Sequence, residues 1–456
     1  MQKILIALTA LAAAFIVFLL GAVITHFKVF PYGYFRDAFL AAEALLAEPQ
    51  EDKRENLYLG AKPFHPEDAE MPEIRWDTPG VTRYDPARAF NGYTVYTPVR
   101  SNFPIRLADM QGDTLWEWNI DWDAFKGERL DGSSLRIDAD VAGQGYLGLG
   151  EPTLFPNGDM LLVVNTAWFT PWGAGLMKVD KIGAAIWSYT RQVHHEVSVA
   201  PDGRIYALTH EVINEPWPGL ETIQTPFLDD FVAVLSPDGE ELQYVSVLEA
   251  IQGSPWESLL MYADPVAVKG DLLHVNSIFY LQDKHAAFIP GAEAGDVLLS
   301  LRNLDVLAVM DLDDTTIKWA ARGPWRLQHD ADVLDNGNLL LFDNRGDLAN
   351  GGTSRILEVN PRSLEIVWEY PGAGSDERLY TSFLGSQKRL RNGNTLISES
   401  NNGRILEVTP DRDVVWEYRV PEMKSRQNDQ PVATVVFSNR FLPGELEFLT
   451  GSGNSP

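Results

Sequence analysis

Two histidines in this sequence stand at the same distance from a turn. His329 lies seven residues before Asn336 of an Asp-Asn-Gly-Asn turn, and His195 lies seven residues before Asp202 of a Pro-Asp-Gly turn. The chain has only 8 histidines in 456 residues, so the shared spacing needs an explanation. A neutral imidazole acts as a nucleophile or as a general acid and base near pH 7. The same offset from two other turns leads to glycine, at Gly150 and Gly385.

A third histidine and an arginine stand on other apolar segments. Alternation along residues 271–278 places His274 and Asn276 on one face of an expected strand. Arg302 ends an apolar run and offers a planar fork of donors that suits an anionic group. Three histidines are also a ligand set for zinc. Zinc ligands give no reason for an arginine beside them, so we predict no metal here.

Two repeated elements must position these residues. One is a strand, a polar turn and a second strand that ends in an aromatic residue, over residues 103–118, 175–189, 231–245, 305–319, 354–370 and 403–418. The other is a tight turn before an apolar strand, over residues 156–164, 201–208, 335–342 and 391–398. Trp319, Trp368 and Trp416 are 49 and 48 residues apart. Short strands with Gly-rich turns at such a period are typical of β-propeller blades, and six hairpins predict about six blades.

A closed ring of blades explains the shared position of two histidines. Equivalent positions on the innermost strands face one axis, so His195 and His329 are expected to converge although they are 134 residues apart. Each histidine taken alone is better explained as a hydrogen-bonded residue near a strand end, and it is the paired register that favours convergence on the axis. We expect residues 432–437 and 445–449 to be strands that close the ring on the first blade, because closure removes exposed sheet edges.

Insertions stretch the middle repeats, over residues 211–226 and 282–295. Insertions in a repeat protein usually lie on one face, often the binding face. These insertions and their flanks contain three aromatic residues that either form a wall for a ring-shaped substrate or pack the loops, Trp217, Trp256 and Tyr262.

The composition is that of a globular, acidic protein with an apolar N-terminal segment. The net charge of −27 repels nucleic acid, and the absence of cysteine excludes disulfides and thiolate sites. Residues 4–25 are 22 residues without a charge, enough for a helix that crosses the hydrocarbon core. We predict an uncleaved signal anchor over residues 1–28, a helical and Pro-rich linker over 29–90 and the propeller over 91–456. The propeller is expected on the periplasmic side of the inner membrane.

Four segments, taken in order, resemble the bacterial arylsulfotransferase family. They are HHEVSVAPDGRIYALTHE (194–211), GDLLHVNSIFY (270–280), GDVLLSLRNLDVLAVMD (295–311) and GPWRLQHDADVLDNGNLLLFDN (323–344). The Gln-His-Asp, Asn-Gly-Asn and Phe-Asp-Asn groups of the last segment are the most specific part. The resemblance covers roughly residues 90–440. It departs from the family in having no cysteine pair and an insertion between His274 and Arg302.

The resemblance implies a six-bladed propeller that moves a sulfuryl group from an aryl sulfate to a phenol, without the nucleotide donor PAPS and without a cofactor. It implies that His329 is the nucleophile that carries the sulfuryl group. His195, His274 and Arg302 are implied to surround the sulfuryl and phenolic oxygens, with either histidine as the general acid and base. His194 replaces His195 if the register differs by one. We predict three substrate contacts, Asn276, His194 and Asn344.

Other features are left open at this point. Either Asp330 or a nearby carbonyl is expected to hold the tautomer of His329. A non-catalytic scaffold at the membrane is an alternative function, but a scaffold has no need to place these histidines and Arg302 on one axis. A quinone-dependent dehydrogenase is a third, disfavoured because it needs a calcium site and the more regular tryptophan repeats of an eight-bladed ring. The oligomeric state is not predicted.

Overall fold

The structure is a computed structural model that describes most of the chain beyond residue 77. The described residues are Leu19 and residues 78–98, 104–128, 134–136, 147–166, 172–221, 223, 225–263, 270–348, 351–372, 378–381, 383–421, 425–427, 430–432 and 435–450. The chain divides into two compact units, Met1–Asn56 and Leu57–Pro456. All described residues except Leu19 lie in the second unit.

The expected membrane segment over residues 4–25 lies outside the described residues, apart from Leu19. Within the described part of the chain, no helix has both the length and the apolar character needed to cross a bilayer. The signal anchor therefore stays a prediction.

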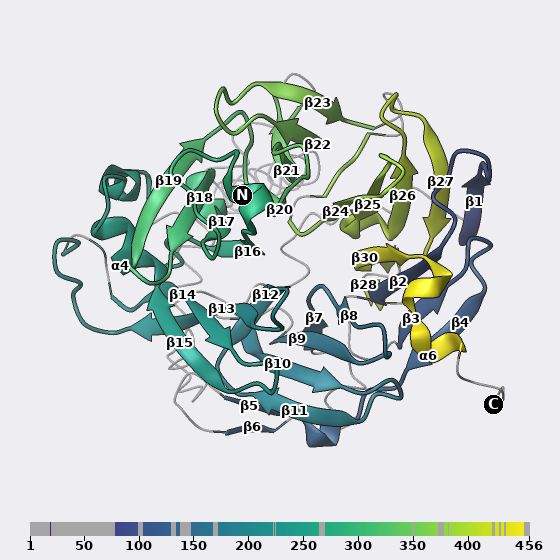
Figure 1. Ribbon diagram of the computed structural model, residues 1–456, viewed down its shortest axis with the longest axis horizontal. Helices are drawn as coiled ribbons and strands as arrows, with labels where there is room; N and C mark the ends of the chain where they lie inside the picture. Colours follow the sequence, from purple (N-terminus) through teal and green to yellow (C-terminus); the bar gives the residue numbers. More distant parts are fainter. Residues whose placement is uncertain are drawn as a thin grey trace, which may run out of the picture. The chain divides into compact units, whose positions relative to one another are not determined.

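Six antiparallel sheets make up most of the described part of the second unit, and Figure 1 shows them as blades around a common centre. This confirms the all-β propeller with six blades. Numbered along the chain and named from the inside outward, blade 1 is β30 (Val435–Phe441), β2 (Tyr93–Pro98), β3 (Ile105–Ala108) and β4 (Thr114–Trp118). Blade 2 is β7 (Leu147–Leu149) with β8 (Thr153–Leu154), then β9 (Met160–Thr166), β10 (Gly173–Val179) and β11 (Ala185–Tyr189). Blade 3 is β12 (Val193–Val199), β13 (Ile205–Ile213), β14 (Phe227–Leu235) and β15 (Glu241–Ser246).

The other three blades repeat this order. Blade 4 is β16 (Val275–Tyr280), β17 (Val297–Leu301), β18 (Val306–Asp311) and β19 (Thr316–Arg322). Blade 5 is β20 (His329–Val333), β21 (Leu339–Asp347), β22 (Thr353–Val359) and β23 (Ile366–Tyr370). Blade 6 is β24 (Ser386–Arg389), β25 (Thr395–Glu399), β26 (Arg404–Val408), β27 (Val414–Arg419) and, outermost, β1 (Gly80–Tyr84).

Short elements connect or flank the blades. Two small hairpins are β5 (Lys126–Glu128) with β6 (Ser134–Arg136) and β28 (Ser425–Gln427) with β29 (Gln430–Val432). Within the described ranges beyond residue 77, the helices are α4 (Val247–Gln252), α5 (Asp283–Ala286) and α6 (Glu447–Thr450), with 3₁₀ turns η3 (Trp122–Ala124), η4 (Glu257–Tyr262), η5 (Arg302–Leu304), η7 (Ser400–Asn402) and η8 (Pro443–Glu445).

The two ends of the described chain close the ring on both sides of one junction. β30 pairs with β2 on the inner edge of blade 1, and β1 pairs with β27 on the outer edge of blade 6. β1 lies within the segment that was expected to be a linker. Two regions, 432–437 and 445–449, were expected to supply strands that close the ring. Only the first does so, through β30. Residues 443–450 form η8 and α6 instead, in keeping with Pro443, whose fixed φ suits the first turn of a helix.

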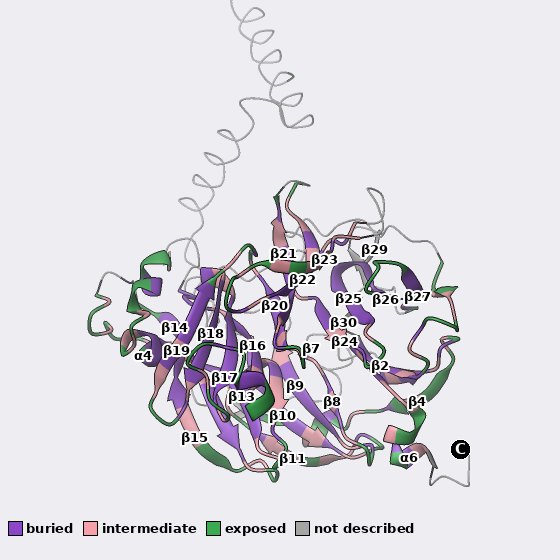
Figure 2. Cartoon of the chain, turned by 45° about the horizontal axis from the view of Figure 1, so that its top comes forward, coloured by how far each residue is buried: buried purple, intermediate pink, exposed green. Residues whose placement is uncertain are grey.

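The blades pack face to face, so most strands are buried on both sides. Between blades 4 and 5 the core joins Leu298 and Leu307 to Leu339 and Leu341. Figure 2 shows buried residues along the inner strands and exposed residues at turns and outer edges. A strand covered on both faces has a continuous apolar sequence, which explains runs such as Leu-Leu-Leu-Phe.

Tryptophans of the outer strands tie blades to their neighbours. In three places an indole Nε1 donates to a backbone carbonyl in the outer turn of the next blade. These bonds join Trp116 to Lys181 (2.8 Å), Trp368 to Pro410 (2.8 Å) and Trp416 to Met110 (3.0 Å). The repeated contact gives a physical reason for the regular spacing of aromatic residues along the chain.

Candidate active site

The innermost strands bring three histidines together near the centre of the ring. His195 lies on β12, His274 directly precedes β16, and His329 begins β20. The ring centroid of His195 lies 5.1 Å from that of His274 and 6.5 Å from that of His329. Residues of three blades, far apart in the sequence, thus form one cluster.

The backbone is distorted where these histidines stand. His195 and His274 have φ angles of 57° and 52°, and Asp330, which follows His329, has a φ of 47°. Residues other than glycine are uncommon in this left-handed region, and they cluster at functional sites. The distortion turns side chains of the innermost strands out of the regular alternation.

Blades 3 and 5 can be aligned by their strand pairing or by the distance from their turns, and the two alignments match His329 to different residues. Bulges of unequal size explain the difference. Strand pairing shifts between His194 and Val197 on β12 and between His329 and Asp332 on β20. The bulge of β12 contains one residue more than the bulge of β20. Counted along the hydrogen-bond ladder His194 matches His329, whereas counted from the turn His195 does. His195 is the one whose ring faces the other two histidines of the cluster.

The hydrogen bonds of His329 define its tautomer. Its Nδ1 lies 2.8 Å from Asn344 Oδ1 and 3.1 Å from the Leu327 carbonyl oxygen. The Asn344 amide nitrogen donates to the carbonyls of Thr381 (2.8 Å) and Leu384 (2.7 Å), so its oxygen must face the histidine. Both neighbours of Nδ1 are therefore acceptors. His329 carries its proton on Nδ1 and keeps the lone pair of Nε2, which accepts from the Leu384 N–H at 3.3 Å.

His329 is also held neutral. Burial, with the nearby Arg302 guanidinium, places the pKa of His329 well below its usual value. Asp330 does not contact the ring nitrogens, because its carboxylate accepts from the Gln387 N–H at 2.5 Å and pairs with the Lys388 ammonium at 3.1 Å. Either Asp330 or a nearby carbonyl was expected to fix the tautomer of His329. The side-chain carbonyl of Asn344 and the backbone carbonyl of Leu327 do so.

Arg302 has a buried donor without a protein acceptor. Its backbone N–H donates to the His274 carbonyl at 3.2 Å, which places it beside the cluster, and Nη1 donates to Asn303 Oδ1 at 3.0 Å. Its Nε is buried and has no hydrogen-bond partner among the described residues. Burial lowers the pKa of Arg302. A buried guanidinium N–H without an acceptor costs free energy, so the arrangement favours an anionic ligand.

His274 is oriented by a carboxylate that the sequence reasoning did not select. Its Nδ1 lies 2.5 Å from Asp271 Oδ2. Asp271 stands three residues before His274, a spacing that is visible in the sequence. The predicted substrate contact Asn276 donates from Nδ2 to the Gln328 carbonyl at 2.8 Å, and so ties β16 to the residue that precedes His329.

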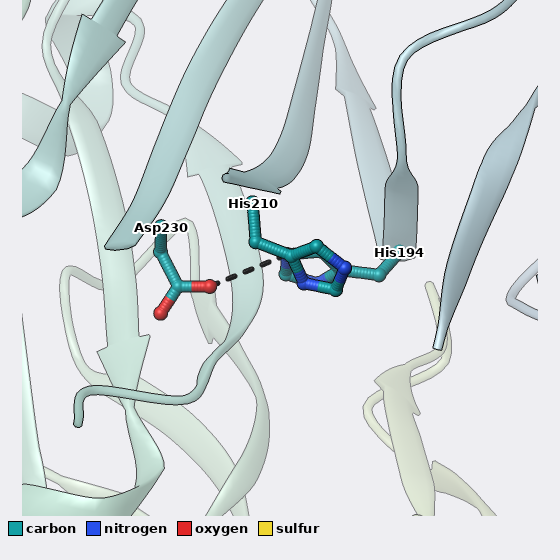
Figure 3. Close-up of side chains that lie close together, drawn as sticks. All are labelled: His194, His210 and Asp230. Carbon is teal, nitrogen blue, oxygen red and sulfur yellow. Dashed lines mark ion pairs between the residues drawn. The ribbon is translucent and has the colours of Figure 1, made fainter. Parts of the chain in front are cut away.

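A second group of polar residues backs His195. His194 Nδ1 lies 2.7 Å from His195 Nδ1, and His194 Nε2 lies 3.3 Å from Asp230 Oδ1 (Figure 3). The ring of His210 stacks on that of His194, with centroids 4.6 Å apart and planes at 20°. All of His194, His210 and Asp230 are at least 96% buried. Burial lowers the pKa values of His195 and His210 well below their usual range.

Trp172 lines another side of the cluster. Its ring centroid lies 4.7 Å from that of His274 and 5.8 Å from that of His195. It was not selected from the sequence, although it ends the unusual run Trp-Phe-Thr-Pro-Trp at residues 168–172. The three aromatic residues of the insertions and their flanks lie elsewhere. Trp217 and Trp256 pack against the core around α4, and Tyr262 stacks under the Arg322 guanidinium.

Two groups of described residues have the residue types of a metal site, but the arrangement of each argues against a bound metal ion. The rings of His194 and His210 are stacked, so their in-plane lone pairs run side by side rather than converging on one ion. The other group joins Glu151, Glu196 and Asp330. The Lys388 ammonium lies 3.5 Å from Glu151 and 3.1 Å from Asp330, where a cation would bind.

The comparison with family models gives a single strong match. A model described as arylsulfotransferase (ASST) matches residues 151–420, which is more than half of the chain and includes every residue of the site described above. No curated protein matches the sequence.

Solved structures resemble the chain only in broad outline. A protein of unknown function from Bacteroides caccae is 10% identical, with 76% of this chain and 98% of that chain covered and a TM-score of 0.45. A streptogramin B lyase is 11% identical, with 81% and 97% covered and a TM-score of 0.38. A quinohemoprotein alcohol dehydrogenase from Comamonas testosteroni is 12% identical, with 80% and 74% covered and a TM-score of 0.38. At these values the likenesses carry no functional argument.

Proposed function

Because the chain belongs to the arylsulfotransferase family, we propose that it moves a sulfuryl group from an aryl sulfate to a phenol through a sulfohistidine at His329, without PAPS. The observation that carries the proposal is the state of His329. A neutral imidazole with its proton on Nδ1 has its lone pair on Nε2, which attacks once the substrate displaces the Leu384 N–H from it.

The first half-reaction forms the covalent intermediate. Nε2 of His329 attacks sulfur, the N–S bond forms, and the bond from sulfur to the phenolic oxygen breaks with its electron pair on the departing phenolate. As in phosphoryl transfer, negative charge lies on three equatorial oxygens, with entry and exit in line. The Asn344 and Leu327 acceptors stabilise the positive charge that the ring gains when Nε2 bonds to sulfur.

Arg302 and His274 face the group that is transferred. The buried Nε–H of Arg302 needs an anionic acceptor, and a sulfuryl oxygen is one. His274 is oriented by Asp271, so its Nε2 is directed away from that carboxylate and toward the substrate. In the second half-reaction the oxygen of an acceptor phenol attacks sulfur, its proton passes to a histidine, and His329 is released with its lone pair restored.

The three predicted substrate contacts take different roles in this proposal. Asn344 orients His329, and His194 contacts His195, so both act through another residue. Asn276 uses its nitrogen to hold the strand of His329, while its buried oxygen has no donor among the described residues. Asn276 therefore remains the member of this set for which contact with substrate is proposed.

The cellular placement is proposed from the sequence alone. We propose that the uncharged residues 4–25 anchor the chain in the inner membrane and that the propeller works on the periplasmic side. Aryl sulfates and phenols are small enough to diffuse to such a site.

The test uses the full-length chain in detergent with 4-nitrophenyl sulfate, a phenol acceptor and no nucleotide. We expect a burst of nitrophenolate followed by turnover that depends on the acceptor. His329→Asn should remove the burst and lower turnover by at least about 10³-fold, as loss of a nucleophile does. His285→Asn changes a buried histidine of α5 outside the cluster, and should retain the burst.

Either of two results would contradict the proposal. A burst that persists in folded His329→Asn would exclude His329 as the carrier of the sulfuryl group. No release by the wild type across a panel of aryl sulfates would instead favour a binding protein.

A further inference from the structure

We propose that Asp230 and His194 form a buried chain that positions His195 as the base for the acceptor phenol. The inference rests on the sulfuryl transfer proposed above and assigns its second half-reaction. Asp230 and His194 are positioning residues, since they act through His195. The series runs from Asp230 on β14 through His194 on β12 to His195 in the cluster, and Figure 3 shows its first two members, Asp230 and His194.

The carboxylate of Asp230, at the start of this hydrogen-bonded series, determines which ring nitrogen of each histidine carries the proton. Asp230 Oδ2 accepts from the Val275 N–H at 3.0 Å, and Oδ1 faces His194 Nε2 at 3.3 Å. The second approach is not aligned as a hydrogen bond, but a carboxylate beside a ring nitrogen favours N–H over a lone pair there. With its proton on Nε2, His194 has an acceptor at Nδ1.

His195 must then donate to His194. The two Nδ1 atoms are 2.7 Å apart, so one carries a proton and the other a lone pair. Because His194 supplies the lone pair, His195 carries its proton on Nδ1 and keeps the lone pair of Nε2. This Nε2 has no hydrogen-bond partner within the described ranges. His195 is thereby held in the tautomer that accepts a proton from substrate.

The surroundings distinguish His195 from His274. The ring of His195 lies beside other imidazole rings, namely those of His194 on its own strand, His274 before β16 and His329 on β20. His210 on β13 is near enough to act on it electrostatically. His274 instead lies directly against the Asp271 carboxylate, which stabilises a charged imidazolium. We therefore assign His274 to donate to the sulfuryl oxygens together with Arg302, and His195 to the phenolic proton.

The proton transfer balances within the second half-reaction. The acceptor phenol O–H gives its proton to His195 Nε2 as its oxygen bonds to sulfur and the N–S bond to His329 breaks. His195 becomes an imidazolium whose Nδ1–H is held by His194, and the Asp230 carboxylate stabilises the positive charge through the His194 ring. The proton leaves to water before the next turnover.

The test separates the two half-reactions in the full-length chain. In Asp230→Asn, the Val275 N–H still requires the amide oxygen, so the amide NH₂ faces His194 Nε2 and reverses both tautomers. His195 then presents N–H to the phenol. With 4-nitrophenyl sulfate, whose leaving group needs no acid, we expect the nitrophenolate burst to persist while acceptor-dependent turnover falls about 10²-fold or more.

A purely structural role would not give the expected pH dependence. The defect should shrink as the pH rises through the pKa of the acceptor phenol, because a phenolate needs no base. Asp229→Asn is the matched control, since Asp229 is a buried neighbour on β14 that bonds to Ser246 and the Leu248 N–H instead. His194→Leu is a second variant that removes the acceptor for His195 and should show the same separation.

The outcomes are distinct. Acceptor-dependent turnover that is unchanged in both variants overturns the inference. Burst and turnover that fall together, equally at every pH, show a structural role and overturn it as well. A wild type without a burst contradicts the proposed function itself, whereas a wild-type burst with unaffected variants contradicts only this inference.

Discussion

At His329 two hydrogen-bond acceptors decide which nitrogen is reactive. They hold the proton on Nδ1, and the Leu384 N–H, 3.3 Å from Nε2, favours the same tautomer with its lone pair on Nε2. Asn344 is effective because the carbonyls of Thr381 and Leu384 leave its amide a single orientation. The neutral state follows from burial and from Arg302, which opposes a second positive charge nearby.

Replacement of Asn344 by aspartate should protonate the nucleophile. A carboxylate beside Nδ1 stabilises the imidazolium, so we expect the pKa of His329 to rise by about 1–3 units. The neutral form is then lost as the pH falls through the raised value. In the wild type the acidic limb of the burst rate should lie below pH 6.5, the usual histidine pKa, and in the variant it should move upward. The measurement is the burst rate with 4-nitrophenyl sulfate from pH 5 to 9.

Asn394→Asp controls for the loss of buried amide donors. Asn394 also donates from a buried amide, to the Arg88 carbonyl and to Glu407, and it takes no part in the histidine cluster. It should lose stability without a displaced acidic limb. An Asn344→Asp profile that superimposes on the wild type would show that Asn344 does not set the charge of His329.

At the scale of elements, the inner strands carry the chemistry and the outer strands hold the blades together. The bulge of β12 turns His195 into the cluster, and it leaves little room in the neighbouring blade. A Cβ at Gly150 would lie only 2.1 Å from the His195 carbonyl oxygen, which explains a glycine at that position. Outer strands have no such constraint and instead repeat the tryptophan contacts to the next blade.

The indole hydrogen bond between blades 5 and 6 should stabilise the fold measurably. Trp368→Phe keeps a ring but removes the bond to the Pro410 carbonyl, so we expect a loss of about 1 kcal/mol. Trp187→Phe is the matched control, because Trp187 is an equally half-buried outer-strand residue whose Nε1 has no hydrogen-bond partner among the described residues. Thermal melts of both variants provide the comparison. Equal losses would show that ring packing, not the hydrogen bond, ties these blades.

At the scale of the whole propeller, charged residues from four blades meet on and beside the inner strands. Lys388 of blade 6 lies within 3.5 Å of Glu151 of blade 2 and of Asp330 and Asp332 of blade 5. The carboxylate of Glu196 of blade 3 lies within 4.8 Å of those of Glu151 and Asp330. Burial opposes the charge on Lys388, but the carboxylates outweigh it and hold the pKa of Lys388 well above its usual value. Burial also raises the pKa of Glu151 to about 8 and that of Asp332 to about 6.

Removal of this ammonium should destabilise the propeller in a pH-dependent way. A carboxyl group whose pKa is raised in the folded state stabilises the fold at a pH below its unfolded pKa, which is about 4. That stabilisation is lost as the pH rises through the pKa of the folded state. We expect Lys388→Met to lose about 3–5 kcal/mol at pH 8, where the carboxylates are left unpaired. The loss should be smaller at pH 5, where Glu151 and Asp332 are protonated. Thermal melts at both pH values measure the difference.

Lys284→Met provides the comparison for a surface pair. Lys284 pairs with Asp335 at 2.6 Å, but both side chains are largely exposed. Its removal should cost no more than about 1 kcal/mol and change little with pH. A Lys388→Met loss of the same small size at both pH values would refute the structural role of the central charges.

The sequence by itself determined the six-bladed architecture, because strand patterns, turns and the aromatic period are local signals that recur along the chain. Its spacing also brought His195 and His329 together, since equivalent positions of a closed ring face one axis. Only the tertiary structure decided what each histidine contacts. Bulges of different size turn the side chains of the inner strands, so Asn344 and Asp230 become partners through contacts that no spacing reveals. The three-residue spacing of Asp271 and His274 is visible in the sequence, but only the fold shows that it makes a hydrogen bond. The ring closure through β1 and the four-blade charge cluster likewise exist only once distant strands have paired.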